Sequence, residues 1–254
     1  MDSDRYSIHF SPLQGYTDRI YRNAFAHYFG GVEVYYTPFI RVEKGALRKR
    51  DLRDIEPETN TVADLIPQIL PGSADEFRLL TDAVGGKGYR QIDINLGCPF
   101  PMIAGKHKGA GMLLYPAQVA EVLAPIAEYP EIQFSLKMRL GWENASECMV
   151  LVELLNAIRL SRIALHARTG KQQYKGHPDL EAFQGFYELC QHPLYYNGGI
   201  EKAHVVLGDY AKTALLQPGE SGCVTLKLKA SDMVSYDHVD ANGNGFKGYE
   251  LEQG

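Results

Sequence analysis

Short apolar segments alternate along most of the chain with segments of helical periodicity. The apolar segments end at polar or turn-forming residues, which is typical of buried strands. Between them, the spacing of apolar residues predicts helices. The predicted strands cover residues 8–13, 32–39, 65–70, 91–96, 134–140, 162–166 and 194–197, and the predicted helices cover residues 17–28, 73–84, 116–127 and 146–158. Repeated strand–helix units of this kind predict a parallel sheet covered by helices.

Three of the predicted helices carry recognisable start signals. Ser73 is followed three residues later by Glu76, which is the sequence of a capping box. Pro116 suits a first helical turn, and Ser146 suits an N-cap. These signals support the helical assignment of the segments between the strands.

The number of strand–helix units predicts an α/β fold of the TIM-type (β/α)8 barrel class. Such a barrel takes about 250 residues, and the seven units end near Gly199 with no eighth unit after them. The barrel is therefore predicted to be incomplete after strand 7. Alternation over residues 223–229 and turn residues over 240–245 predict a short β-rich tail. The predicted domains are 1–199 and 200–254.

Charge and cysteine content narrow the class of protein. The net charge of −5 gives no global signal for nucleic acid, although a local basic face is compatible with it. The N-terminal residues lack the apolar core of a signal peptide, and no segment approaches the ~20 apolar residues of a membrane span. The four cysteines form no C-x-x-C pair. We therefore expect reduced thiols in a cytoplasmic protein without a metal site.

Polar side chains stand at the ends of successive predicted strands. Because the carboxyl ends of parallel strands meet at one mouth of a barrel, these side chains are expected to converge there. They are Gln68, Asn95 with Cys98, Lys137 with Arg139, His166 with Arg168, and Asn197. The sequence thus predicts an active site at this mouth.

Cys98 is the candidate with the most reactive side chain. It follows the strand end at Gly97, and residues 105–111 beyond it contain three glycines and two lysines. That composition predicts an exposed, mobile, cationic loop, on which a thiol can donate a proton or attack an electrophile. The alternative is a cysteine that packs as a small buried hydrophobe.

Lys137 is a cation inside an otherwise apolar strand. Alternation places it on one face with Ser135 and Arg139. A buried cation needs an anionic partner, such as the pyrimidine end of a reduced flavin, or a structural ion pair. His166 suits a phosphate or ring carbonyl, or a satisfied position in the core. The charged run over residues 48–51 indicates a solvated face, with phosphate contact as the alternative.

Together these segments resemble the tRNA-dihydrouridine synthase family of flavoproteins. The resemblance covers residues 1 to about 199, with six motifs in the family's order. They are Ser11-Pro-Leu-Gln-Gly-Tyr-Thr-Asp18, Asp93-Ile-Asn-Leu-Gly-Cys-Pro99, the glycine segment over 106–113, Leu136-Lys-Met-Arg139, His166-Ala-Arg-Thr-Gly170 with Gln173-Tyr-Lys-Gly176, and Asn197-Gly198.

The resemblance implies a barrel that holds FMN and reduces uridine to dihydrouridine in tRNA with NADPH. Cys98 would be the general acid that protonates carbon 5 of the uracil. The implied substrate-side residues are Asn95, Arg139 and Arg168. The implied cofactor-binding residues are Pro12 and Leu13 through their backbone, with Gln68, Lys137, His166, Asn197 and Gly198.

The C-terminal part departs from the family pattern. Asn197-Gly198-Gly199 stands where the family has Asn-Gly-Asp, and no Gly-Arg-Gly segment follows to bind the FMN phosphate, so weak FMN binding is expected. The tail resembles the fibronectin-type-III-like module of family-three glycoside hydrolases, over residues 215–220, 224–228, 232–237 and 249–254. Two alternatives stay open. One is a flavin barrel oxidoreductase acting on a free pyrimidine, and the other is an inactive composite chain with an accessory tail.

Overall fold

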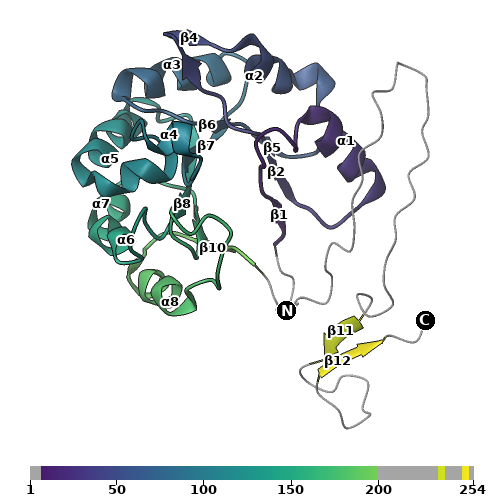
Figure 1. Ribbon diagram of the computed structural model, residues 1–254. Coiled ribbons are helices and arrows are strands. Elements are labelled where there is room, and N and C mark those ends of the chain that lie inside the picture. The colour runs from purple at the N-terminus through teal and green to yellow at the C-terminus, as the bar shows by residue number, and fades with distance from the viewer. Residues whose placement is uncertain (1–6, 200–233, 238–247, 252–254) are drawn as a thin grey trace. The chain divides into compact units, whose positions relative to one another are not determined.

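The computed structural model describes residues 7–199, 234–237 and 248–251 (Figure 1). The chain divides into two compact units, Met1–Gly198 and Gly199–Gly254, and each is described by itself. Most of the predicted β-rich tail, including residues 215–220 and 224–228, lies outside the described residues. Within the second unit, β11(Val234–Asp237) pairs antiparallel with β12(Gly248–Leu251).

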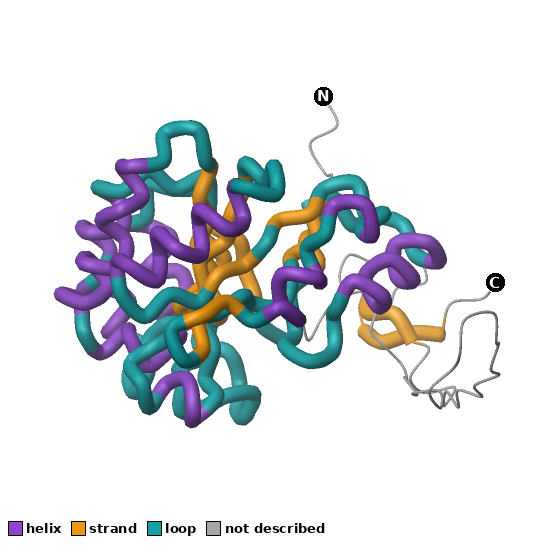
Figure 2. Tube along the Cα trace, turned by 90° about the horizontal axis from the view of Figure 1, so that it is seen from above, coloured by secondary structure: helices purple, strands orange, loops and turns teal. Residues whose placement is uncertain are grey.

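The first unit is built on two parallel sheets that follow each other along the chain. The first has the order β1-β2-β5, with β1(His9–Phe10), β2(Val34–Tyr36) and β5(Leu65–Ile66). The second has the order β10-β9-β8-β7-β6, with β6(Gln68–Ile69), β7(Gln91–Leu96), β8(Gln133–Arg139), β9(Ile163–His166) and β10(Leu194–Asn197). Helices lie outside these strands, as Figures 1 and 2 show.

Strands β5 and β6 are the two halves of one predicted strand over 65–70. Pro67 separates them, because proline has no N–H to donate to a ladder. Ile66 pairs with Tyr36 on one side of this break, and Gln68 pairs with Asp93 on the other. The two sheets therefore form one curved wall with seven strand positions. Within residues 7–199 this α/β architecture confirms the predicted TIM-type barrel class and is consistent with a barrel of seven strand positions.

The edge strands β1 and β10 contact each other through side chains within the described residues. The rings of His9 and Tyr195 lie with their centroids 4.4 Å apart. Asn197 Nδ2 donates to Ser11 Oγ at 3.4 Å. These contacts link the first and last strand positions of the wall, where no backbone pairing is recorded among residues 7–199.

The outer layer consists of short helices. They are α1(Arg19–Tyr28), α2(Lys49–Asp54), α3(Ala74–Gly85), α4(Pro101–Ala104), α5(Pro116–Leu123), α6(Glu147–Val150), α7(Val152–Asn156) and α8(Leu180–Leu189). Single 3-10 turns occupy Pro57–Thr59, Gly109–Leu114 and Ala124–Glu128, and a hairpin of β3(Val42–Glu43) and β4(Ala46–Leu47) precedes α2. The side chains between the helices and the strands form one large apolar core.

The start of α3 confirms its predicted cap with one change. Ser73 Oγ accepts from the backbone N–H of Glu76 at 3.2 Å. The Glu76 carboxylate, however, accepts from the backbone N–H of Gly72 at 2.8 Å. Glu76 also pairs with the ammonium group of Lys108. The carboxylate thus ties the helix start to the segment that follows Cys98.

Several local predictions are wrong. Residues 146–158 form two short helices, and Ser146 makes no capping hydrogen bond. Strand β1 is shorter than the predicted strand over 8–13. The sequence pattern did not indicate α8, whose N-cap Asp179 accepts from the N–H of Ala182 at 2.9 Å.

Two segments predicted to be exposed are partly buried. The segment after Cys98 forms a 3-10 turn whose residues from Gly109 to Leu113 are buried, because they pack against β7 and α5. Asp51, in the predicted solvated run, is only 8% exposed and lies on α2. No helix in the described part of the chain is long and apolar enough to cross a membrane.

Close backbone packing at Gly111 generates a stability prediction. A Cβ at this position would overlap the main chain of Ala104, whose Cα would lie 2.7 Å away. We expect Gly111→Ala to lower the free energy of unfolding by about 2 kcal/mol through overpacking. Gly30→Ala is the control, because no atom lies within 4 Å of its Cβ position. Equal denaturant midpoints for the two variants would contradict the packing described here.

Candidate active site

A buried chain of hydrogen bonds crosses the wall of the barrel from β8 to β6. The Asp93 carboxylate accepts from Ser135 Oγ at 2.6 Å and from Gln68 Nε2 at 2.7 Å. Gln68 Oε1 accepts from Asn95 Nδ2 at 2.8 Å. All four side chains are at most 7% exposed. A carboxylate that only accepts forces the Gln68 amide to direct its NH₂ group toward Asp93.

The Asn95 side chain links this hydrogen-bond chain to the segment that carries the Cys98 thiol. Its Nδ2 is directed to Gln68, so its Oδ1 remains to accept from the backbone N–H groups of Gly97 and Cys98, at 3.0 and 2.8 Å. Strand β7 ends at Leu96, and the Asn95 side chain holds the next two residues in a tight turn. The position of Cys98 is therefore set from within the barrel wall.

The Cys98 side chain is half-buried at the edge of a small apolar cluster of Phe39, Leu70 and Ile103. Burial raises the pKa of the Cys98 thiol above its ordinary value, against a lowering by the Phe100 backbone and by Arg139 and Lys137. The thiol is thus protonated at neutral pH. A protonated thiol is suited to donate a proton, whereas a nucleophile requires the thiolate.

Lys137 enters the barrel from β8, opposite Asn95 in the strand register. It lines an interior cavity of about 90 Å³ together with Asp93, Pro12, Asn197 and Tyr36. Burial and then the charge of Arg139 lower the pKa of Lys137 to about 8, against the raising effect of Asp93. Among the described residues, none forms a hydrogen bond with its ammonium group. The cavity therefore contains a cation with unused donors.

Arg139 joins two loops of the barrel mouth. Its Nε donates to the carbonyl of Gly97 at 2.9 Å, and its Nη1 donates to the carbonyls of Thr169 and Gln173 at 2.9 and 2.7 Å. The guanidinium carbon lies 5.6 Å from the centre of the Tyr174 ring. The side chain is 2% exposed. In this structure the hydrogen-bond donors of Arg139 bind the loop after β7 and the loop after β9.

His166 and Arg168 follow β9 into the same mouth. Arg168 Nη1 lies 3.3 Å from His166 Nε2, and its Nε donates to the carbonyl of Gly176 at 3.1 Å. Burial and the charges of Arg139, Lys137 and Arg168 lower the pKa of His166 to about 3. The imidazole is thus neutral and accepts from Arg168 or a ligand.

The structure places some of the predicted residues around the interior cavity and others in the hydrogen-bonded chain. Pro12, Lys137 and Asn197 line the cavity, and Gln68, Asn95 and Cys98 are joined by the hydrogen bonds described above. Leu13 is 48% exposed, and its N–H and carbonyl are used by Thr17. Leu13 and Gly198 are not among the lining residues of the cavity.

Asp93 is a central residue that the sequence analysis did not single out. The signal was present, because an aspartate inside the apolar run 91–96 shares its face with Asn95 under strand alternation. No group of three or more potential metal ligands occurs within the described ranges 7–199, 234–237 and 248–251. The functional groups at the mouth are a thiol, a lysine, a carboxylate, an imidazole, amides and guanidinium groups.

Fold and site together define an α/β-barrel protein with a protonated cysteine near its mouth. The same site contains a lysine whose ammonium group makes no hydrogen bond to a described residue. Comparison with known proteins specifies the family. The family model described as "Dihydrouridine synthase (Dus)" matches residues 9–219, and the chain belongs to this family. The match continues past residue 199, the predicted limit of the resemblance.

Individual relatives show the same similarity. The chain is 28% identical over 215 residues to "tRNA-dihydrouridine synthase B" of Vibrio parahaemolyticus, covering 81% of this chain and 65% of the relative. It is 29% identical to the protein of the same name from Pseudomonas aeruginosa, covering 81% and 63%. The chain thus spans slightly under two thirds of the length of these curated relatives.

One solved structure is similar at a low level. A GH18 chitinase from Pseudoalteromonas aurantia superimposes with a TM-score of 0.44 and 11% sequence identity, covering 75% of this chain and 79% of the chitinase chain. No argument about fold or function rests on this similarity.

The Asn95 contacts predict how the thiol segment responds to mutation. Asn95→Ala removes the acceptor of two N–H groups, so we expect faster hydrogen exchange at Gly97 and Cys98 and a several-fold faster alkylation of Cys98. Asn156→Ala is the matched control, since it removes an asparagine that accepts from the backbone N–H of Gln191 at 2.9 Å and makes no hydrogen bond to the thiol segment. Alkylation rates that change equally in both variants would refute a specific role for Asn95.

The lowered pKa of Lys137 predicts a pH-dependent stability. Between about pH 8 and its ordinary pKa of 10.5, the folded state binds fewer protons than the unfolded state at this residue, so its contribution to stability rises with pH. Between pH 7 and pH 10 the unaltered chain should therefore gain about 2 kcal/mol of stability relative to Lys137→Met, which has no titrating group at this position. A pH-independent difference in urea unfolding would contradict the burial of this charge.

Proposed function

We propose that this chain carries the flavin-dependent site of a tRNA-dihydrouridine synthase, which reduces uridine to dihydrouridine in tRNA with NADPH. The main support for the proposal is that one barrel mouth contains both a protonated Cys98 thiol and the Lys137 ammonium group, which makes no hydrogen bond to a described residue. Membership of the dihydrouridine synthase family supports it. The named relatives are tRNA-dihydrouridine synthases, which supports tRNA as substrate.

The polar groups of the cavity suit the pyrimidine edge of a flavin ring. The ammonium group of Lys137 has donors that no described residue uses, and Asn197 and Pro12 line the same space. A reduced flavin carries negative charge at its pyrimidine end, which a neighbouring cation stabilises. We assign ring contacts to Lys137, Asn197 and the Pro12 carbonyl. FMN is the proposed form of the flavin, and NADPH its proposed reductant.

Lys137, Asn197 and Pro12 would hold the flavin, and its chemistry there would be hydride transfer to carbon 6 of the uracil. Cys98 would then donate its proton to carbon 5, where enolate-like charge develops. The raised pKa keeps this proton on sulfur until it is needed. Asn95 and Arg139 hold the segment that carries the thiol, through Cys98 N–H and the Gly97 carbonyl. With His166 Nε2 accepting from Arg168, the other ring nitrogen of the neutral imidazole would donate a hydrogen bond to a uracil carbonyl.

The target uridine must leave its base stack to reach a site inside a barrel. The loop with Arg168 and Tyr174 would border the extruded base, since Tyr174 is 67% exposed and its ring centroid lies 6.2 Å from that of His166. Arg168 is 8% exposed and remains a proposed substrate contact. A cytoplasmic location is the proposed setting for this tRNA chemistry.

The test is a flavin assay on the purified chain with FMN and NADPH. NADPH should bleach the flavin absorption, and unmodified tRNA should restore it with formation of dihydrouridine. Cys98→Ala should retain the bleaching and lose roughly 10²-fold or more of the tRNA-dependent step, because it removes a general acid.

Cys190→Ala is the control cysteine, because its thiol contacts the His192 carbonyl away from the mouth. Reoxidation by free uracil but not by tRNA would assign the site to a free pyrimidine instead. A protein that binds no flavin at saturating FMN would refute the proposed activity of this chain.

A further inference from the structure

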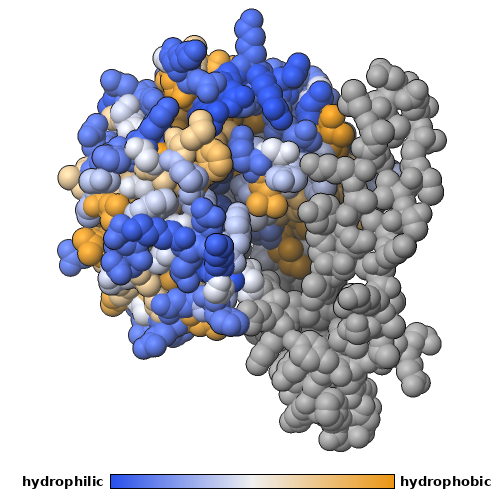
Figure 3. Space-filling view, viewed as in Figure 1, coloured by the Kyte–Doolittle hydropathy of each residue, from blue (hydrophilic) through white to orange (hydrophobic). Residues whose placement is uncertain are grey.

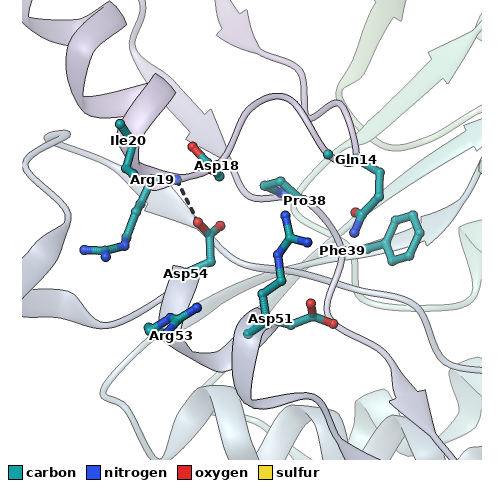
Figure 4. A pocket seen from close by; sticks show the side chains of 11 residues that line it. Gln14, Asp18, Arg19, Ile20, Pro38, Phe39, Asp51, Arg53 and Asp54 are labelled. Carbon is teal, nitrogen blue, oxygen red and sulfur yellow. Dashed lines mark hydrogen bonds between the residues drawn. The ribbon is translucent and has the colours of Figure 1, made fainter. Parts of the chain in front are cut away.

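A second cavity opens at the rim of the same mouth. Its volume is about 150 Å³, and it lies between the loop after β1, the loop after β2, and helix α2. Figure 4 shows Asp18 and Asp54 on one side of it, and Gln14 and Phe39 on the other. We call it the rim pocket. It includes Arg50 and Asp51 of the charged run that the sequence analysis singled out.

The carboxylates of the rim pocket accept hydrogen bonds from the chain itself. Asp54 accepts from the N–H of Arg19 at 2.7 Å, the dashed line of Figure 4, and from Arg22 Nη1 at 3.0 Å. Asp18 caps α1 by accepting from the N–H of Tyr21. Asp51 is 8% exposed and accepts from the backbone of Arg41. Asp54 and Asp18 therefore have protein partners, whereas the second oxygen of Asp51, Oδ2, is buried without a hydrogen-bond partner among the described residues.

The guanidinium groups of Arg50 and Arg53 in the pocket, unlike its carboxylates, make no described hydrogen bonds. Arg50 and Arg53 are exposed, and neither side chain donates a hydrogen bond to a residue in the described part of the chain. Neighbouring arginines differ, since Arg41 and Arg48 both pair with Glu43. Among the charged, solvent-exposed side chains of the rim pocket, the unused hydrogen-bonding groups are thus the guanidinium donors of Arg50 and Arg53. Such donors in a fork geometry fit a phosphate group.

The rim pocket shares a wall with the thiol cluster. Phe39 lines the pocket and also belongs to the apolar cluster against which Cys98 packs. A single side chain therefore separates the pocket from the surroundings of the proposed general acid. Hydrophilic residues dominate the face of the molecule seen in Figure 3, as expected for a surface that meets a polar partner.

We infer that the rim pocket is a subsite for a backbone phosphate of the RNA substrate, next to the nucleotide whose base enters the barrel. Arg50 and Arg53 hold the phosphate, and Phe39 separates it from the thiol. The inference rests on the proposed function for the identity of the RNA, and it adds the position at which the chain holds the backbone. It also explains why a protein of net charge −5 binds RNA through a local site.

The test measures tRNA affinity rather than turnover. Unmodified tRNA is titrated against the full chain and against the double variant Arg50→Gln/Arg53→Gln, over a range of salt concentrations. We expect about tenfold weaker binding and a salt slope smaller by about 1, as for one lost phosphate contact. Both side chains are exposed and make no described hydrogen bond, so the variant is expected to fold normally.

Arg78→Gln is the matched control, because Arg78 already pairs with Glu128 at 2.8 Å on the surface of α3. Its tRNA affinity and salt slope should equal those of the unaltered chain. An unchanged salt slope in the double variant, or no tRNA binding by the unaltered chain, overturns the inference. Binding without dihydrouridine formation overturns only the proposed function.

A nicotinamide dinucleotide is the other source of a phosphate. Reduction of the bound flavin by NADPH is therefore measured in the same variants. We expect the KM for NADPH to remain unchanged. A raised KM for NADPH with unchanged tRNA affinity would assign the rim pocket to the dinucleotide and overturn the RNA subsite.

Discussion

The buried carboxylate of Asp93 is the interaction on which the candidate site depends. A carboxylate in the wall of a barrel is costly unless hydrogen bonds satisfy it. Ser135 and Gln68 supply those bonds. Because the carboxylate can only accept hydrogen bonds, it fixes the orientation of the Gln68 amide. The Gln68 oxygen then fixes the orientation of the Asn95 amide, and the Asn95 oxygen accepts from the N–H of Cys98. The same charge also raises the pKa of the neighbouring Lys137.

The barrel mouth is preorganised mainly by side chain to main chain bonds. Arg139 joins the thiol segment to the loop after β9, and Glu76 joins the start of α3 to Lys108 beyond the thiol. These bonds hold the candidate acid at a defined place before any ligand arrives, which lowers the cost of reaching a reactive geometry. The predicted mobile loop is therefore an ordered part of the site.

The two cavities differ in how strongly solvent screens their charges. The interior cavity contains Lys137 beside Asp93, where charge is shielded from water and acts strongly. The rim pocket contains exposed guanidinium groups, where charge attracts a polyanion but is screened by salt. Phe39 lines the rim pocket and packs in the same apolar cluster as Cys98. The arrangement suits a large substrate that is held outside while one base reacts inside.

Periodicity in the sequence predicted the strands β7 and β10 to the residue, the start of α3, and the α/β barrel class. These features depend on local propensity and on which faces are apolar, so the sequence alone is sufficient. It also predicted that Gln68, Asn95, Cys98, Lys137 and Arg139 meet at one mouth, because parallel strands end on the same side.

Only the tertiary structure decided what those side chains do. Asp93, Gln68, Asn95 and Arg139 are oriented by partners 25 or more residues away in the sequence. The burial of Asp51 and the exposure of Arg50 depend on packing between elements. The break at Pro67 could be located from the sequence, but its two different pairing partners could not. Hydrogen-bond orientation and burial are properties of neighbours in space, and a one-dimensional pattern does not contain them.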